Sequence, residues 1–96
     1  MVEIRLTEEF RKAMNRLSGA RRREVQTAIV LAARSWADSD RQSAVTIRNI
    51  RPGIYEARSG ARLRLLFVKE QAGLDFVMFG DHRAVKDFIC GRDHGS

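Results

Sequence analysis

The pattern of hydrophobic and polar positions is clearest between Ile54 and His82, where three runs alternate apolar with polar side chains. A period of two residues is typical of β-strands that have one apolar face. The runs are separated by Ser59-Gly60-Ala61 and Gln71-Ala72-Gly73. Each of these turns carries a glycine, the residue that supplies the positive φ of hairpin loops. The stretch therefore predicts a three-stranded antiparallel meander.

The two faces of this meander differ in chemistry. The apolar face, which we expect to pack against helices, consists of Leu63, Leu65, Phe67, Phe76 and Met78. The other face, called the arginine face below, carries Glu56, Arg58, Arg62 and Arg64. Fixed guanidinium groups on a pleated surface suit a bound phosphodiester, and the alternative is an ordinary solvated sheet face. In both cases we expect the arginine face to stay open to water.

A strand and two helices are predicted before the meander. Val2 to Leu6 alternates as a short strand that can join the sheet edge, and Thr7 is expected to cap the first helix. The second helix should run from about Ala20 to Ala37, antiparallel to the first. Apolar residues at helical spacing give each helix a buried stripe. These are Phe10, Ala13, Met14 and Leu17, followed by Val25, Ala28, Ile29, Ala32 and Trp36.

The remaining segments are a connector and a C-terminal helix. Asp38 to Gln42 is polar and turn-like, and Val45 to Gly53 reads as a connector with a short extended piece. Asp81 is expected to cap the last helix, and the tail from Gly91 to Ser96 is expected to fray. The inner face of this helix consists of Val85, Phe88 and Ile89, and the single Cys90 is expected to pack.

These elements predict one α+β domain over residues 1–96. An antiparallel β-sheet, made of the N-terminal strand plus the three-stranded meander, should pack against the two N-terminal helices, with a short C-terminal helix after it. A chain of 96 residues is long enough for one modest core.

Composition adds a preference for acidic partners. Lys and Arg total 18 against 12 Asp and Glu, so the net charge is +6 and the sequence pI is about 10.7. This charge predicts attraction to nucleic acid or to an acidic protein. We find no secretory signal and no membrane-spanning run, and we expect a soluble, cytoplasmic protein without a membrane partner. One cysteine excludes an intramolecular disulfide and a zinc-binding cysteine cluster.

The run Arg21 to Arg23 lies in the first turn of the second predicted helix. Cations there oppose the helix dipole. A bound phosphate or an acidic partner would offset that cost, and the alternative is a solvated helix face.

The order strand, helix, helix, meander and final helix resembles the RelE/ParE superfamily, the toxins of bacterial type II toxin–antitoxin pairs. The stretch Pro52 to Arg58 is similar to the proline-glycine-aliphatic-tyrosine-glutamate-x-arginine motif of that family. Arg64-Leu65-Leu66-Phe67 is similar to its arginine-aliphatic-aliphatic-aromatic strand. Gly80-Asp81-His82, followed by Phe88, stands where members place a terminal catalytic residue and an aromatic. The resemblance covers nearly the whole chain.

The resemblance implies a mechanism for those members that cleave messenger RNA on the ribosome. A 2′-hydroxyl attacks the adjacent phosphate without a metal or other cofactor, while basic side chains hold the charge. Arg64 matches the arginine that grips the scissile phosphate, and Arg58 matches a basic residue on the neighbouring strand. His82 resembles the terminal histidine of some members. Glu56 stands where others have lysine, and it is a candidate for the complementary acid–base role.

The resemblance also implies partners and leaves the activity open. Arg62, Arg51 and Arg48 are candidates for RNA binding, and a cognate antitoxin is expected to form a hetero-oligomer with the chain over its basic surface. Phe88 stands near a position where some members have a reactive tyrosine, and phenylalanine cannot transfer a proton. Three functions therefore remain: an endoribonuclease toxin, a DNA gyrase poison of the ParE type, and an inactive member that only binds nucleic acid. An acid–base group such as His82 is needed only for the first.

Overall fold

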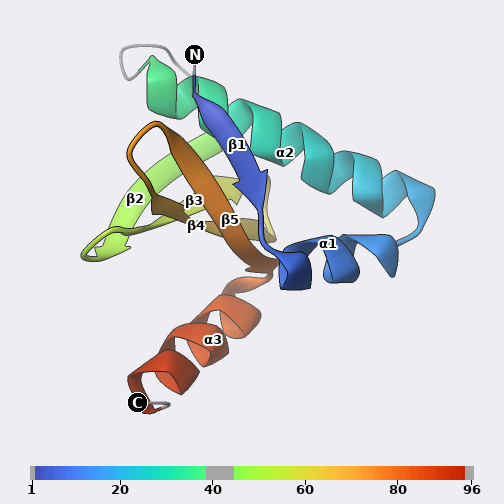
Figure 1. The fold of residues 1–96 in the computed structure, drawn as a ribbon. Helices are drawn as coiled ribbons and strands as arrows, with labels where there is room; N and C mark the ends of the chain where they lie inside the picture. Colours follow the sequence, from blue (N-terminus) through green and yellow to red (C-terminus); the bar gives the residue numbers. More distant parts are fainter. Residues whose placement is uncertain (1, 39–44, 95–96) are drawn as a thin grey trace.

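The computed structural model describes residues 2–38 and 45–94, which form five strands and three helices (Figure 1). The strands make one mixed sheet in the spatial order β1-β5-β4-β3-β2. In chain order the elements are β1 (Glu3–Leu6), α1 (Glu8–Asn15), α2 (Gly19–Ala37), β2 (Val45–Arg51), β3 (Ile54–Ser59), β4 (Leu63–Lys69), β5 (Gly73–Gly80) and α3 (His82–His94). The fold is α+β, and the expectation of a purely antiparallel sheet is wrong.

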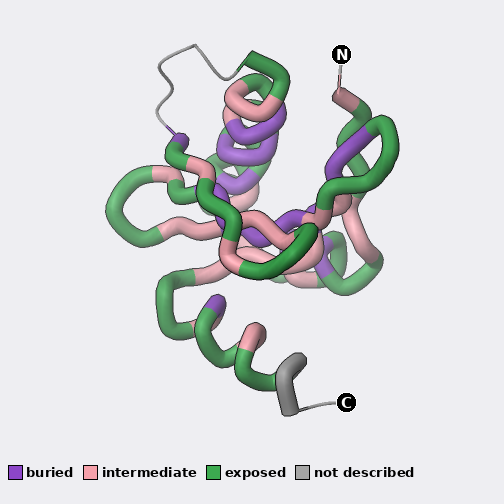
Figure 2. The backbone as a smooth tube through the Cα atoms, turned by 90° about the vertical axis from the view of Figure 1, so that its left-hand side faces the viewer, coloured by how far each residue is buried: buried purple, intermediate pink, exposed green. Residues whose placement is uncertain are grey.

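The elements form three layers. Helices α1 and α2 run in roughly opposite directions across one face of the sheet (Figure 1), and α3 lies on the other side (Figure 2). Among the described residues, no helix is long and apolar enough to cross a membrane.

The main core lies between α1, α2 and the apolar face of the sheet. Phe10 from α1 meets Phe76 edge to face, with ring centroids 6.2 Å apart. Trp36 from α2 packs on Tyr55 at 4.7 Å and on Phe67 at 5.7 Å. The predicted helical stripes are confirmed except at Ala13, which is only half-buried. The residues packed into or against this cluster include Phe10, Met14, Leu17, Val25, Ala28, Ile29, Ala32 and Trp36.

One residue of the predicted apolar face lies on the wrong side. The pairing of β4 with β5 shifts register between Leu66 and Phe67, so that Leu66 pairs with Met78 while Phe67 pairs with Phe76. This bulge inserts one extra residue, Val77, and reverses the alternation beyond it. Met78 therefore shares the arginine face with Leu66, and Phe79 takes its place in the main core.

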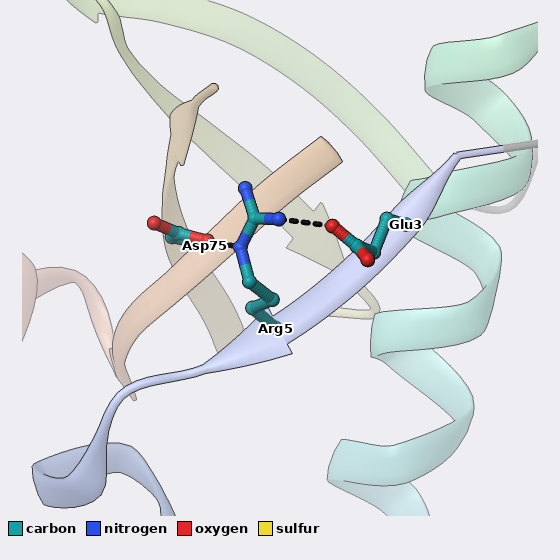
Figure 3. A network of polar contacts seen from close by, with 3 residues as sticks. All are labelled: Glu3, Arg5 and Asp75. Carbon is teal, nitrogen blue, oxygen red and sulfur yellow. Dashed lines mark hydrogen bonds and ion pairs between the residues drawn. The ribbon is translucent and has the colours of Figure 1, made fainter. Parts of the chain in front are cut away.

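The N-terminal strand joins the sheet edge as expected, but it pairs parallel to β5. Gly73 permits this close approach, since a Cβ there would lie 2.4 Å from the backbone oxygen of Glu3. Figure 3 shows Arg5 between two carboxylates, with Glu3 on its own strand and Asp75 on β5. The hydrogen bond from Arg5 to Asp75 measures 2.5 Å and is the main cause that raises the pKa of the guanidinium above its usual value.

The segment interpreted as a connector contains a full strand. β2 pairs antiparallel with β3, and Pro52-Gly53 turns the chain between them. Gly53 has a φ of +77° and Gly60 a φ of +68°, as tight turns require, whereas Gly73 has no positive φ. The prediction of a positive-φ glycine is therefore right for the first meander turn and wrong for the second. The predicted turn from Asp38 to Gln42 falls almost entirely outside the described residues.

Local sequence signals set the helix starts. Thr7 caps α1 by accepting a hydrogen bond from the Phe10 N–H at 3.2 Å, and Asp81 caps α3 by accepting one from the Ala84 N–H at 2.8 Å. Both N-caps are confirmed. Ser18 caps α2, which begins at Gly19, one residue before the predicted start at about Ala20.

One arginine of the run at the start of α2 has a structural role. Arg22 donates hydrogen bonds to the carbonyl oxygens of Met14 (3.3 Å), Asn15 (3.3 Å) and Leu17 (3.4 Å). These carbonyls lie at and just beyond the C-terminal end of α1, where a cation satisfies acceptors that lack helical partners. This contact offsets the unfavourable position of Arg22 in its own helix.

The C-terminal helix is longer than predicted and covers part of the arginine face. It packs against β4 and β5, with Val85 at 3% exposure and Leu66 at 0%. The expectation of an open, wet face is therefore wrong around Leu66, because apolar side chains on that face need a cover. Cys90 is exposed and does not pack. Part of the segment expected to fray, Gly91 to His94, is helical, and residues 95–96 lie outside the described part.

Candidate functional site

Glu56 and Arg64 form the centre of the arginine face. Arg64 Nη1 lies 3.4 Å from Glu56 Oε1 and 3.5 Å from Oε2. The side chain of Glu56 is only 4% exposed and that of Arg64 is 16% exposed. A carboxylate buried this deeply needs a cationic partner. The pair therefore fixes one guanidinium at the surface of the sheet.

Two more arginines surround this pair through the strand register. Arg58 on β3 is the direct cross-strand neighbour of Arg64, and Arg48 on β2 is the neighbour of Glu56. Both are exposed. Like charges directly opposite each other are destabilising, and a bound anion relieves that repulsion. Within the described residues neither Arg58 nor Arg48 forms an ion pair, so both are available to an anionic ligand.

His82 lies near the end of the sheet where Arg64 pairs with Arg58 and Gly80. It is exposed at the first position of α3, two residues after Gly80, and Gly80 is the cross-strand neighbour of Arg64. A Cβ on Gly80 would lie 2.7 Å from the Ala84 Cβ, so the missing side chain lets α3 start close to the sheet. His82 therefore stands at the border between α3 and the arginine face.

The other two predicted RNA-binding residues lie apart from this cluster. Arg62 is exposed in the turn between β3 and β4. Arg51, the last residue of β2, pairs with Ile54 at the start of β3. Arg58, the neighbour of Arg64, lies near the other end of β3. Of the seven residues predicted from the sequence, the register thus groups Glu56, Arg58, Arg64 and Arg48, with His82 at the border.

A pocket near the paired residues Arg64 and Gly80 could not be predicted from the sequence. This pocket, called the turn pocket below, has a volume of about 480 Å³. It is lined by Arg21, Glu24, Ser59, Arg62, Leu63, Phe79, Gly80 and Asp81. Its walls come from the first turn of α2, the β3–β4 turn and the end of β5. These segments are far apart in the chain, and no pattern in the sequence showed that they meet.

Within residues 2–38 and 45–94, no group of three or more His, Cys, Asp or Glu side chains lies close enough together to hold a metal ion.

Comparison with known proteins gives one structural neighbour. No protein-family model and no curated protein sequence matches the chain. The solution structure of the conserved hypothetical protein HP0894 from Helicobacter pylori is similar over 86% of this chain and 97% of that chain, at 13% identity and a TM-score of 0.49. A likeness of this strength assigns neither a family nor a function.

Proposed function

We propose that the chain is the toxin of a type II toxin–antitoxin pair and acts as a metal-independent messenger RNA endoribonuclease on the ribosome. The observation that carries this proposal is the guanidinium of Arg64, held by the buried Glu56 and placed directly opposite the exposed Arg58. The fixed guanidinium of Arg64 and the exposed guanidinium of Arg58, on neighbouring strands, match a phosphate that gains negative charge during reaction. The motifs shared with the RelE/ParE superfamily support the same function.

The proposed reaction is an internal transesterification. The ribose 2′-oxygen bonds to the adjacent phosphorus while the bond from phosphorus to the 5′-oxygen breaks, which leaves a 2′,3′-cyclic phosphate and a 5′-hydroxyl. His82 accepts the 2′-hydroxyl proton, because an imidazole nitrogen with a free lone pair is a general base. The departing 5′-oxygen takes a proton from solvent water. Arg64 and Arg58 hold the charge of the phosphorane.

Burial changes the role that we assign to Glu56. At 3% exposure, and with both carboxylate oxygens facing Arg64, it has little access to a substrate. We therefore assign it to positioning the Arg64 guanidinium rather than to proton transfer.

The test is cleavage mapping of messenger RNA on ribosomes with purified protein. We expect Arg64→Ala to lower the rate about 10² to 10³-fold and His82→Ala about 10² to 10⁴-fold. Arg83→Ala is the matched control, since Arg83 is exposed, adjacent to His82 and outside the proposed site. Treatment of the purified protein with EDTA, followed by removal of the EDTA before ribosomes are added, should leave wild-type cleavage unchanged.

Two results would contradict the proposal. The first is full activity of His82→Ala, and the second is loss of wild-type cleavage on intact ribosomes after the purified protein has been treated with EDTA and the EDTA has been removed. A gyrase supercoiling assay runs in parallel, because inhibition of supercoiling without RNA cleavage would instead support a gyrase poison that uses the same arginine face. RNA binding with neither activity would support the inactive nucleic-acid-binding member.

The proposed partner is a cognate antitoxin that lays an acidic or amphipathic segment over Arg58, Arg62 and Arg64. The net charge of +6 would speed this association and make it sensitive to salt, while apolar contacts would supply most of the lasting affinity. Hydrogen exchange of the complex should slow in β3 and β4. Unchanged exchange in both strands would place the partner elsewhere.

A further inference from the structure

The turn pocket combines cationic, carboxylate and apolar groups in one hollow. Arg21 and Glu24 come from α2, Arg62 comes from the β3–β4 turn, and the partly buried Leu63 and Phe79 supply apolar surface. Its volume of about 480 Å³ falls within the range of about 300 to 1,000 Å³ that is usual for small-molecule sites. The lining therefore suits a ligand with both an anionic and a flat apolar part.

The charges of the lining narrow the choice of ligand. Arg21 and Arg62 are balanced by Glu24 and Asp81, so the pocket has no excess charge to hold a free polyphosphate. The Asp81 carboxylate is already engaged in capping α3. The ion pair between Arg21 and Glu24 is 3.5 Å long, and its side chains are 69% and 57% exposed, so a ligand can displace it at little cost. A single phosphodiester charge with a base and a ribose fits this balance.

The position of the turn pocket links it to the proposed catalytic site around Arg64. Gly80 lines the pocket and is also the cross-strand neighbour of Arg64, whose side chain lies on the opposite face of the sheet. The two sites thus meet at the end of β5, with His82 two residues further on. A strand that crosses the sheet at this end would reach both.

We propose that the turn pocket binds one nucleotide of single-stranded RNA next to the phosphate held by Arg64. Arg62 and Arg21 bind its phosphate, Glu24 accepts hydrogen bonds from ribose hydroxyls or base amino groups, and Leu63 and Phe79 contact the base. This inference rests on the proposed function for the neighbouring phosphate, but the pocket's binding of a nucleotide is measured separately.

The experiment measures binding of a short RNA that carries 2′-O-methyl groups throughout and cannot be cleaved by 2′-hydroxyl attack. Arg62→Ala and Arg21→Ala should each weaken its affinity about 10- to 100-fold, the usual effect of losing a charged hydrogen bond. Arg23→Ala is the matched control, because it removes the same charge from the same exposed turn of α2 outside the pocket. The RNA should also shift the amide resonances of Gly60 and Gly80.

Two results would overturn the inference. One is wild-type affinity of both pocket variants for the RNA. The other is that inorganic phosphate alone, at the same concentration, produces the same amide shifts, which would make the pocket a simple anion site.

Cleavage assays separate this inference from the proposed function. If the wild type cleaves RNA and both pocket variants cleave and bind equally well, the pocket assignment is wrong and the nuclease proposal stands. If the wild type does not cleave RNA but loses RNA affinity through Arg62→Ala and Arg21→Ala, the nuclease proposal is wrong and the pocket assignment stands.

Discussion

Removal of Glu56 should destabilise the protein far more than removal of an exposed carboxylate in an ion pair of the same length. Two charges 3.4 Å apart attract by about 5 kcal/mol at an effective dielectric constant of about 20. Desolvation of the two ions offsets most of this attraction, so the intact pair contributes little net stability. Glu56→Ala keeps the cost of burying Arg64 and removes its partner.

The magnitude follows from the burial of the two side chains. Loss of one partner from a buried ion pair costs about 3 to 5 kcal/mol. Arg64 keeps 16% of its side-chain surface, so water partly replaces the carboxylate and we expect about 3 kcal/mol. Glu56→Gln retains an acceptor oxygen for the Arg64 guanidinium and should therefore cost less than Glu56→Ala.

The assay is chemical denaturation of the wild type, Glu56→Ala, Arg64→Ala and the double variant. We expect a coupling free energy of about 1 to 3 kcal/mol from this cycle. The matched control is Glu8→Ala, because Glu8 and Lys12 also lie 3.4 Å apart but are 77% and 66% exposed. That change should cost less than about 1 kcal/mol. If Glu56→Ala costs no more than Glu8→Ala, the carboxylate is not held against Arg64 and the positioning role is wrong.

Two further predictions concern the sheet. Leu65→Ala should lower the free energy of unfolding by about 2 to 5 kcal/mol, because Leu65 is 0% exposed in the main core; an unchanged denaturation midpoint would contradict its burial. Gly73→Ala should cost about 1 to 3 kcal/mol and speed hydrogen exchange in β1, because its Cβ would lie 2.4 Å from the Glu3 backbone oxygen. Gly91→Ala is the control for Gly73→Ala, since nothing lies within 4 Å of a Cβ there, and in a helix it should stabilise by about 0.5 to 1 kcal/mol. Equal protection of β1 in the wild type and in Gly73→Ala would refute the close approach of the two strands.

The sequence by itself determined the elements whose signals are local. Alternating side chains predicted β3 and β4, and helical spacing predicted the buried stripes that include Phe10 and Trp36. The N-caps Thr7 and Asp81 were predicted because a side-chain oxygen reaches backbone N–H groups only three residues away. The same alternation put Glu56, Arg58 and Arg64 on one face, and the strand register confirms this grouping.

Only the tertiary structure decided the contacts between distant segments. The bulge at Val77 depends on how β5 pairs with β4, and it moves Met78 to the arginine face without any change in the local pattern. The parallel pairing of β1 depends on a backbone that lies about 70 residues further along the chain, and so does the ion pair between Arg5 and Asp75.

Burial of the candidate site was decided in the same way. A charged residue in an alternating strand is exposed unless another element covers it, and α3 covers part of this face because Leu66 and Val85 remove their apolar surface from water together. The turn pocket likewise exists only where three separate segments meet. Alternation fixes which way a side chain points relative to its strand, whereas its solvent exposure depends on long-range packing, so the sequence located the arginines but not the burial that holds Arg64 in place.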